Sequence, residues 1–233
     1  MTGTWINVAA ILVGGTLGAL LGQRVPERMR AIVTHGVALV VFLVGIDMAL
    51  ESSNVILLLA SILFGGMAGE WMQLDRRLNQ LGGWVEQSLH SIPALTSGHF
   101  IQGFVTATVL FCVGPMAILG SIQDGLTGDM TLLGIKSVLD GFSAVALSSA
   151  LGIGVAFSAA PVLLVQGTFS LGASLFEAIL TDAMITELTA VGGLLMIAIS
   201  LTMLEIKTIK VANFLPALLL APLFVGLLGL LAG

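Results

Sequence analysis

A lysine and an aspartate stand four residues apart inside an apolar part of the chain. Lys136 and Asp140 belong to the run LLGIKSVLDGFSAVALSS. On a helix, residues four apart share one face, so the two side chains can pair. A charge near the bilayer centre costs about 2.5 kcal/mol or more unless it is paired or reaches water. We interpret this helix as lining a pathway. The alternatives are a structural ion pair that fixes helix packing, or a Lys136 amine that extends to the interface.

A second candidate is an apolar segment that a proline interrupts. The pair Gly114-Pro115 lies within this segment. Because proline removes a backbone donor and clashes with the preceding helical turn, it predicts a kink or a break in the helix. Carbonyl groups freed at membrane depth persist only inside protein or beside a water-filled cavity. Gln123 and Asp124 gather toward the far end of the same segment. An ordinary kink that runs into a solvated loop is the alternative.

Two more polar residues lie near the ends of apolar segments. Asp47 is about one turn inside the end of one segment, and Gln166 is near the start of another. Carboxylates in such positions would bind a cation or carry protons, and the lysine would hold its aspartate charged or meet an anionic group. The predicted pathway residues are Asp47, Gly114, Pro115, Gln123, Asp124, Lys136, Asp140 and Gln166.

The elements that must position these groups are membrane helices, because the chain has too few charges for a soluble surface. Of 233 residues, 57% are hydrophobic and 9% are charged, whereas soluble domains carry roughly 25% charged residues. This composition argues against a cytosolic enzyme, a nucleic-acid binder and a disordered chain. Apolar runs of about 20 residues favour helices over a porin-type barrel. The predicted fold is an all-α polytopic membrane protein.

The apolar runs predict about eight membrane spans. Each is near the roughly 20 residues that cross the hydrocarbon core. The spans are Ile6–Gln23, Ala31–Leu50, Val55–Met72, Phe100–Ile122, Leu132–Phe157, Pro161–Leu180, Leu188–Glu205 and Phe214–Leu231. A short break at Ser158–Pro161 is predicted to divide the fifth span from the sixth.

The charges in the loops predict the orientation. The first apolar run has no basic residue before it, so we expect a retained span with an external N-terminus rather than a signal peptide. The loops then predicted inside hold Arg24, Arg28, Arg30, Arg76, Arg77, Lys207 and Lys210. The loops predicted outside hold Glu51, Asp124, Asp129, Asp182 and Glu187. This distribution follows the positive-inside rule and places both termini outside.

The longest loop, residues 73–99, has its own pattern. Apolar residues recur at steps of three and four, and charged residues fall between them. This periodicity predicts an amphipathic helix that lies in the inner interface, followed by a linker. A helix packed on a soluble partner is the alternative.

The two ends of the chain resemble each other. Residues 11–54 align with residues 162–205, so that Gly15-Thr16 matches Gly167-Thr168 and Leu50-Glu51 matches Leu204-Glu205. A shift of five spans turns the second copy upside down, and the loop charges reverse accordingly. Chance similarity between glycine- and leucine-rich segments is the alternative. The predicted 3+2+3 organisation is repeat one at 1–72, the interfacial helix at 73–99, a central helix pair at 100–157 and repeat two at 158–233.

Small residues and asparagines suggest local roles. Gly14, Gly18 and Gly22 form one small-residue face, which predicts close helix packing within the chain. Asn54 and Asn213 begin matching spans and are predicted to cap them.

Several stretches resemble one bacterial membrane family. They are GPMAILGSIQDG at 114–125, KSVLDGF at 136–142, FSAAPVLLVQG at 157–167 and the opening GTWINVAAILVGGTLGALLG. The family is catalogued as domain of unknown function 554, and the similarity spans essentially the whole chain. The resemblance implies a bacterial inner-membrane protein that is a possible transporter with no assigned substrate.

These patterns together predict a membrane transporter or channel-like carrier of a small solute or ion, with its site near the repeat interface. The expected partners are the lipid bilayer and the solute or ion, with a homo-oligomer as a possible assembly and with no nucleic acid and no cofactor. The sequence has no HExxH motif, phosphate-binding lysine loop or Cys/His cluster, so we do not expect an enzyme. A membrane scaffold or assembly subunit without transport is the alternative.

Overall fold

The computed structural model describes residues 1–22, 26–80 and 100–232, which form helices and connecting loops with no strand among them. The prediction of an all-α fold is confirmed. A further short helix, Leu74–Gln80, follows α3. The other helices are α1 (Thr2–Gly22), α2 (Glu27–Leu50), α3 (Val55–Trp71), α5 (Phe100–Cys112), α6 (Pro115–Leu126), α7 (Thr131–Leu151), α8 (Gly154–Phe157), α9 (Ala159–Leu171), α10 (Ala173–Ile179), α11 (Asp182–Met203), η2 (Val211–Phe214) and α12 (Pro216–Ala232).

The helices have the length and composition of membrane spans. Within the described ranges, six helical stretches are long and apolar enough to cross a bilayer. Two bent pairs pass the same test, namely α3 with the helix Leu74–Gln80, bent by 53°, and α5 with α6, bent by 58°. If each bent pair is one span, the described part of the chain holds up to eight, which agrees with the sequence prediction.

The division between the fifth and sixth spans differs from the predicted one. The break falls at Gly152, whose φ of 82° favours glycine, and not at Ser158–Pro161. The stretch Gly154–Leu171 counts as a single span, with α9 beginning at Ala159. Pro161 is therefore in the first turn of α9, where a missing backbone N–H is tolerated.

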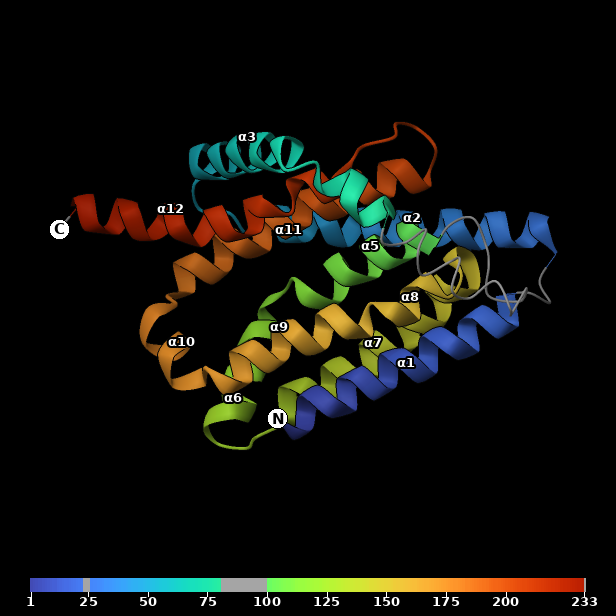
Figure 1. The fold of residues 1–233 in the computed structure, drawn as a ribbon, viewed down its shortest axis with the longest axis horizontal. Coiled ribbons are helices and arrows are strands. Elements are labelled where there is room, and N and C mark those ends of the chain that lie inside the picture. The colour runs from blue at the N-terminus through green and yellow to red at the C-terminus, as the bar shows by residue number, and fades with distance from the viewer. Residues whose placement is uncertain (23–25, 81–99, 233) are drawn as a thin grey trace.

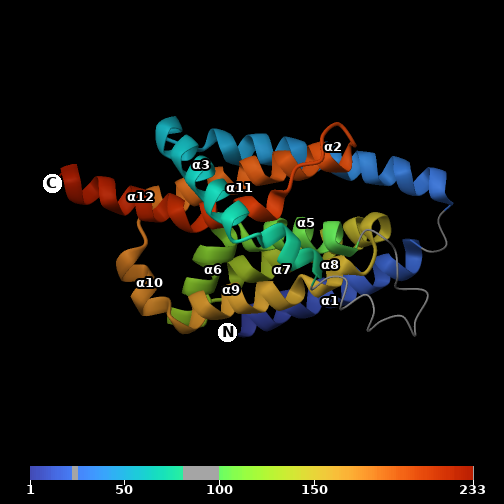
Figure 2. The same ribbon diagram turned by 45° about the horizontal axis from the view of Figure 1, so that its top comes forward.

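The helices form two layers, which Figures 1 and 2 show from two directions. The lower layer of Figure 1 contains α1, α6, α7, α8 and α9, in which α1 packs along α7 and α9 packs against α1 and α6. The upper layer contains α2, α3, α11 and α12, in which α2 packs along α11 and α3 along α12. Helix α5 lies between them and contacts α7, α8, α9 and α11.

The 3+2+3 arrangement is not confirmed as a grouping in space. The first three helices divide between the layers, because α1 lies in the lower one while α2 and α3 lie in the upper one. The last three spans divide in the same way, with α9 below and α11 and α12 above. Each terminal third of the chain therefore supplies one helix to the lower layer and two to the upper layer.

Glycine residues bring α1 and α7 into backbone contact. A β-carbon at Gly14, Gly18 or Gly22 would lie within 2.4 Å of a carbonyl oxygen of α7, and those oxygens belong to residues 141, 145 and 149 in turn. The residue numbers on both helices rise together in steps of four, so α1 and α7 run parallel and each contacts the other along one face. The predicted small-residue face is thus an internal packing surface.

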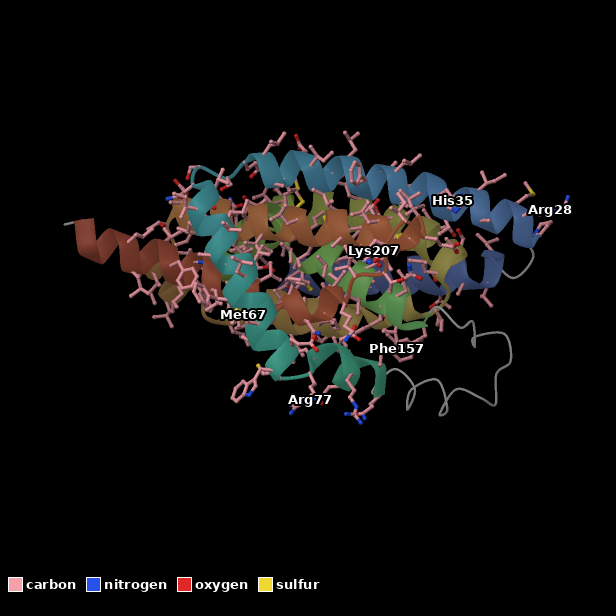
Figure 3. All side chains as sticks on the ribbon, turned by 90° about the horizontal axis from the view of Figure 1, so that it is seen from above. Arg28, His35, Met67, Arg77, Phe157 and Lys207 are labelled. Carbon is pink, nitrogen blue, oxygen red and sulfur yellow. The ribbon has the colours of Figure 1, made fainter. Side chains whose placement is uncertain are left out.

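The upper layer carries large apolar side chains on its outer surface. On α3, Ile56 is 80% exposed and Trp71 is 88% exposed. Apolar surface of this extent is stable in contact with lipid and not with water. Figure 3 shows the side chains of α3 spread outward around Met67. The same view places Arg28 at the end of the molecule opposite the C-terminal end of α12.

The capping predictions have different outcomes. The side chain of Asn54 accepts hydrogen bonds from the backbone N–H groups of Ile56 and Leu57, so it caps α3 as predicted. Asn213 instead accepts a bond from the backbone of Asp75 and donates one to Glu70, which ties η2 to the end of α3. Of the predicted amphipathic segment 73–99, the helix Leu74–Gln80 is described, and the prediction for 81–99 lies outside the described residues.

Candidate functional site

The predicted lysine–aspartate pair is formed and buried in the lower layer. Lys136 donates to Oδ2 of Asp140 on the next turn of α7, and each residue is 7% exposed. The amide nitrogen of Asn7 on α1 donates to the same oxygen at 3.0 Å. The Lys136 amine also lies 5.9 Å from the centroid of the Phe111 ring on α5. The pair is thus shielded by α1 and α5 and does not extend to the surface.

A second carboxylate lies at the start of α1. Asp124, on α6, is 3% exposed, and its Oδ2 accepts a hydrogen bond from the backbone N–H of Gly3 at 3.1 Å. The amino group of Met1 lies 3.1 Å from the same oxygen. A carboxylate in this position satisfies a backbone donor of the first helical turn and interacts favourably with the helix dipole. The other oxygen of Asp124 is left without a partner within the described ranges.

Several buried polar atoms in this layer have no hydrogen-bond partner among the described residues. The residues that carry them are at most 4% exposed. The atoms are Thr4 Oγ1 and Asn7 Oδ1 on α1, Asp124 Oδ1 on α6, and Gln166 Oε1, Gln166 Nε2 and Ser170 Oγ on α9. Unpaired polar atoms are uncommon in folded proteins and each one costs free energy. Their presence on three neighbouring helices marks this region as a candidate binding site, which we call the α1–α6–α9 cluster.

Packing contacts bring the three helices of the cluster together. Helix α6 approaches α9 so closely that a β-carbon at Gly125 would lie 2.1 Å from the carbonyl oxygen of Ser170. Helix α9 meets the start of α1, since a β-carbon at Gly167 would lie 3.4 Å from the Met1 side chain. The Gly3–Asp124 hydrogen bond joins α1 to α6. Figure 1 shows the same meeting point, with the N-terminus beside α6 and the loop that leads into α7.

The predicted break in the fourth span is present. Helix α5 ends at Cys112 and α6 begins at Pro115, which occupies the first turn where no backbone donor is needed. Gly114 between them has φ 157° and ψ 150°, a conformation that is open to glycine and strained for other residues. The two half-helices therefore end within the protein, and this break positions Asp124 at the far end of α6.

The chain matches a known family along almost its whole length. The family is described as protein of unknown function (DUF554), and the match covers residues 2–226. The chain belongs to this family. It is 38% identical over 220 residues to the uncharacterized protein YqgA of Escherichia coli (strain K12), which covers 94% of each chain. It is 30% identical over 229 residues to the uncharacterized membrane protein YdfK of Bacillus subtilis (strain 168), covering 97% of this chain and 96% of the relative.

No solved structure matches this DUF554 chain. Its apolar helices and the name of the Bacillus relative agree that the protein is a membrane protein. The part of the chain that the structure describes holds no group of three or more His, Cys, Asp or Glu residues that could bind a metal ion.

Two predicted pathway residues of the DUF554 chain lie away from the cluster. Asp47 is exposed on α2, in the upper layer. Gln123 is half-buried, and its amide donates to Asp129 at 3.2 Å in the loop between α6 and α7. Hydrogen bonds from the hydroxyl and the backbone of Thr131 lower the pKa of Asp129 below its ordinary value. Asp47 and Gln123 are thus outside the cluster, whereas the other predicted residues with described side chains lie in the cluster, in the buried Lys136–Asp140 pair or at the helix break.

Sequence reasoning missed three residues of the cluster. Thr4, Asn7 and Ser170 are single polar residues in apolar runs. One signal was available, since Thr4 and Asn7 stand three apart and share a helix face. Ser170 is likewise one turn after Gln166, which was predicted. The burial of Glu187, which we had placed in an outer loop, was also missed, because it depends on the loop between α2 and α3.

A separate cavity of about 440 Å³ lies at the opposite end of the DUF554 fold. It opens between α5, α11, the helix Leu74–Gln80 and the loop before η2. Polar and charged residues contribute much of its lining. They are Asp75, Asn79, Gln102, Thr106, Thr202, Thr208 and Lys210. Neither Lys136 nor Asp140 lines this cavity, so it does not connect the buried pair with the surface.

Proposed function

We propose that the protein is a secondary transporter or channel-like carrier of a small solute or ion, with its site at the α1–α6–α9 cluster and the adjoining Lys136–Asp140 pair. The observation that carries the proposal is the set of buried polar atoms on three packed helices that have no partner among the described residues. A cluster that served packing alone would be expected to satisfy these atoms, because each unpaired one costs about 1–3 kcal/mol. A polar ligand would satisfy them when bound.

The helix geometry supports the same proposal. Transporter sites are commonly formed by interrupted helices near the bilayer midplane, where unwound backbone lines a cavity. The fourth span is interrupted at Gly114, and its second half, α6, contributes Asp124 to the cluster. Helix α9, which ends at Leu171 before α10 begins, contributes Gln166 and Ser170.

The contacts also fit the inverted repeat predicted from the sequence. A twofold exchange of the repeats would pair α1 with α9, α2 with α11, and α3 with α12. Each of these three pairs is in contact. Sites of inverted-repeat transporters lie where the repeats meet, and the α1–α9 contact is part of the cluster. We infer that the structure represents a closed state, because the cluster residues are almost fully buried.

The proposed setting is the bacterial inner membrane, with both termini outside. The basic residues at the start of α2 and in the loop after α11 support this orientation under the positive-inside rule. Because the sequence has no nucleotide-binding motif, the energy would come from an ion gradient or from the gradient of the solute itself.

The direct test is flux in proteoliposomes. Full-length protein is reconstituted with an imposed pH or sodium gradient, and flux is followed with an entrapped pH dye and with radioactive sodium. We expect at least a tenfold loss for Asp140→Asn and for Asp124→Asn, since each removes a buried charge from the site. Asp129→Asn is the matched control, because that carboxylate lies on an exposed loop. Equal fluxes in all four proteins would remove the two buried carboxylates from the mechanism.

One observation favours the alternative of a scaffold or assembly subunit without transport. The Lys136–Asp140 pair is buried and also bonded to Asn7, so it resembles a dry structural pair. This alternative predicts that a double apolar replacement, Lys136→Met with Asp140→Leu, is tolerated without loss of function. Normal flux in the double variant would exclude a role for the pair in transport, and absent flux in the wild type under every gradient would favour the scaffold.

A further inference from the structure

The unpartnered atoms of the α1–α6–α9 cluster are mostly oxygens. Among the described residues, a hydroxyl and an amide oxygen come from α1, a carboxylate oxygen from α6, and an amide oxygen and a hydroxyl from α9. The amide nitrogen of Gln166 is the one nitrogen in the set. Hard cations such as alkali and alkaline-earth ions are bound by oxygen ligands of these types. The chemistry of the cluster therefore favours a cation over an anion.

The orientation of Asn7 is fixed by its neighbour. The Asp140 carboxylate accepts hydrogen bonds, so the group of Asn7 that faces it at 3.0 Å must be the amide nitrogen. The amide oxygen of Asn7 consequently faces away from Asp140, and it is buried with no partner in the described part of the chain. Asn7 thus stands between the Lys136–Asp140 pair and the cluster, with a donor on one side and an acceptor on the other.

The carboxylate of Asp124 is oriented in a similar way. Its Oδ2 is held by the N–H of Gly3 and by the amino group of Met1, whose side chain is 31% exposed. Its Oδ1 is buried and without a partner in the described part of the chain. One carboxylate oxygen is therefore buried and available to a ligand, as are the neutral oxygens on α1 and α9.

The charge of the cluster selects a monovalent ion. Calcium sites gain affinity from several carboxylates, whereas this cluster contains one, whose charge is already shared with the Met1 amino group, and Asp140 is paired with Lys136.

We propose that Asp124 Oδ1, Asn7 Oδ1, Gln166 Oε1 and the hydroxyls of Thr4 and Ser170 form a binding site for a monovalent alkali cation between α1, α6 and α9. This inference deepens the proposed transport function and rests on it, since the ion would be the cargo or the coupling ion. The bound ion satisfies five buried oxygens together. Binding is sensed by the Lys136–Asp140 pair through the amide of Asn7.

The binding test does not depend on transport. Thermal unfolding of the purified full-length protein in detergent is measured while NaCl replaces choline chloride at constant ionic strength. An ion that binds only the folded state raises Tm in a saturable way. We expect saturable stabilisation by Na⁺, with LiCl, KCl and CaCl₂ as comparison arms. No stabilisation by any of the three alkali ions, or stabilisation by Ca²⁺ alone, would overturn the proposal.

Conservative variants separate binding from folding. Ser170→Ala and Thr4→Val each remove one hydroxyl, and we expect the Kd for Na⁺ to rise about tenfold in each. Asp124→Asn should abolish the stabilisation, and Asp129→Asn on the exposed loop should leave it unchanged. Unaltered Na⁺ titrations for Ser170→Ala, Thr4→Val and Asp124→Asn would place the ion elsewhere and overturn the site.

The two proposals fail in different ways. Sodium-dependent stabilisation without flux under any gradient would retain the cation site and refute the carrier. Flux without any response of Tm to alkali ions would retain the carrier and refute the cation site.

Discussion

A buried carboxylate of the upper layer and the α1–α6–α9 cluster of the lower layer differ in how their polar atoms are satisfied. In the upper layer, the buried carboxylate of Glu187 accepts hydrogen bonds from the Ser52 hydroxyl, from the backbone and hydroxyl of Ser53, and from the backbone of Asn54. Ser200 on α11 donates to the carbonyl of Ala38 on α2 at 2.7 Å. In the lower layer, the atoms of the α1–α6–α9 cluster have no such partners among the described residues.

This difference separates structural polarity from polarity that is available to a ligand. Satisfied groups such as Glu187 join helices that are far apart in sequence and stabilise the native packing. Unsatisfied groups destabilise it, and under the proposed function those of the cluster serve a ligand and not folding. Four changes test this contrast, starting with the largest expected effect.

Removing one charge of the buried pair should have the largest effect on stability. We expect Asp140→Leu to lower the free energy of unfolding by about 3–5 kcal/mol, because Lys136 is left charged and unpaired. The double variant with Lys136→Met should recover most of that loss. Chemical unfolding in detergent measures both, and a double variant as unstable as the single one would show that the pair does not act as a unit.

Glu187→Ala should come next. It leaves the donors of the loop between α2 and α3 unpaired, and we expect a loss of about 3 kcal/mol of unfolding free energy. Flux per folded molecule should stay near the wild-type value, since the residue lies outside the cluster. A large loss of specific flux with unchanged stability would contradict the division between the layers.

Gly18→Ala should disturb the contact between α1 and α7. The added methyl group would lie 2.3 Å from the carbonyl oxygen of Val145, so the helices must separate, at a cost of about 1–3 kcal/mol. Gly36→Ala is the matched control, because a β-carbon there meets no atom within 4 Å. Equal melting temperatures for the two variants would mean that the close contact of α1 with α7 is not present in the membrane.

Gln166→Leu should have the smallest effect and the opposite sign. Replacing two unpaired amide atoms by an apolar side chain of similar size should stabilise the protein by about 1 kcal/mol, while Na⁺ stabilisation and flux are lost. A rise in Tm together with loss of flux is the pattern of a site whose polarity serves function and not folding. Destabilisation of more than about 1 kcal/mol would indicate that Gln166 has a structural partner after all.

Sequence alone predicted the features that depend on local spacing. The pairing of Lys136 with Asp140, the interruption at Gly114-Pro115 and the small-residue face of α1 all follow from positions along one segment. The number of spans followed from the apolar runs.

Features that depend on how helices are rotated against each other could not be predicted. Asp47 and Asn7 each stand in an apolar run, yet Asp47 is exposed and Asn7 is fully buried. Glu187 is buried because a loop more than 130 residues earlier in the chain folds over it. The division of each terminal third between two layers likewise depends on contacts between helices distant in the sequence.

The glycine contact between α1 and α7 determines which part of the lower layer is free to move. Over Gly14, Gly18 and Gly22 the two backbones touch, so these helices must shift as one rigid rod. Under the proposed function, water would reach the cluster when α6 or α9 moves away from that rod. Each of these helices is bounded by a glycine at one end, Gly114 before α6 and Gly172 after α9. Disulfides that fasten α6 and α9 to α1 would therefore block the proposed movement, whereas one that fastens α1 to α7 would not.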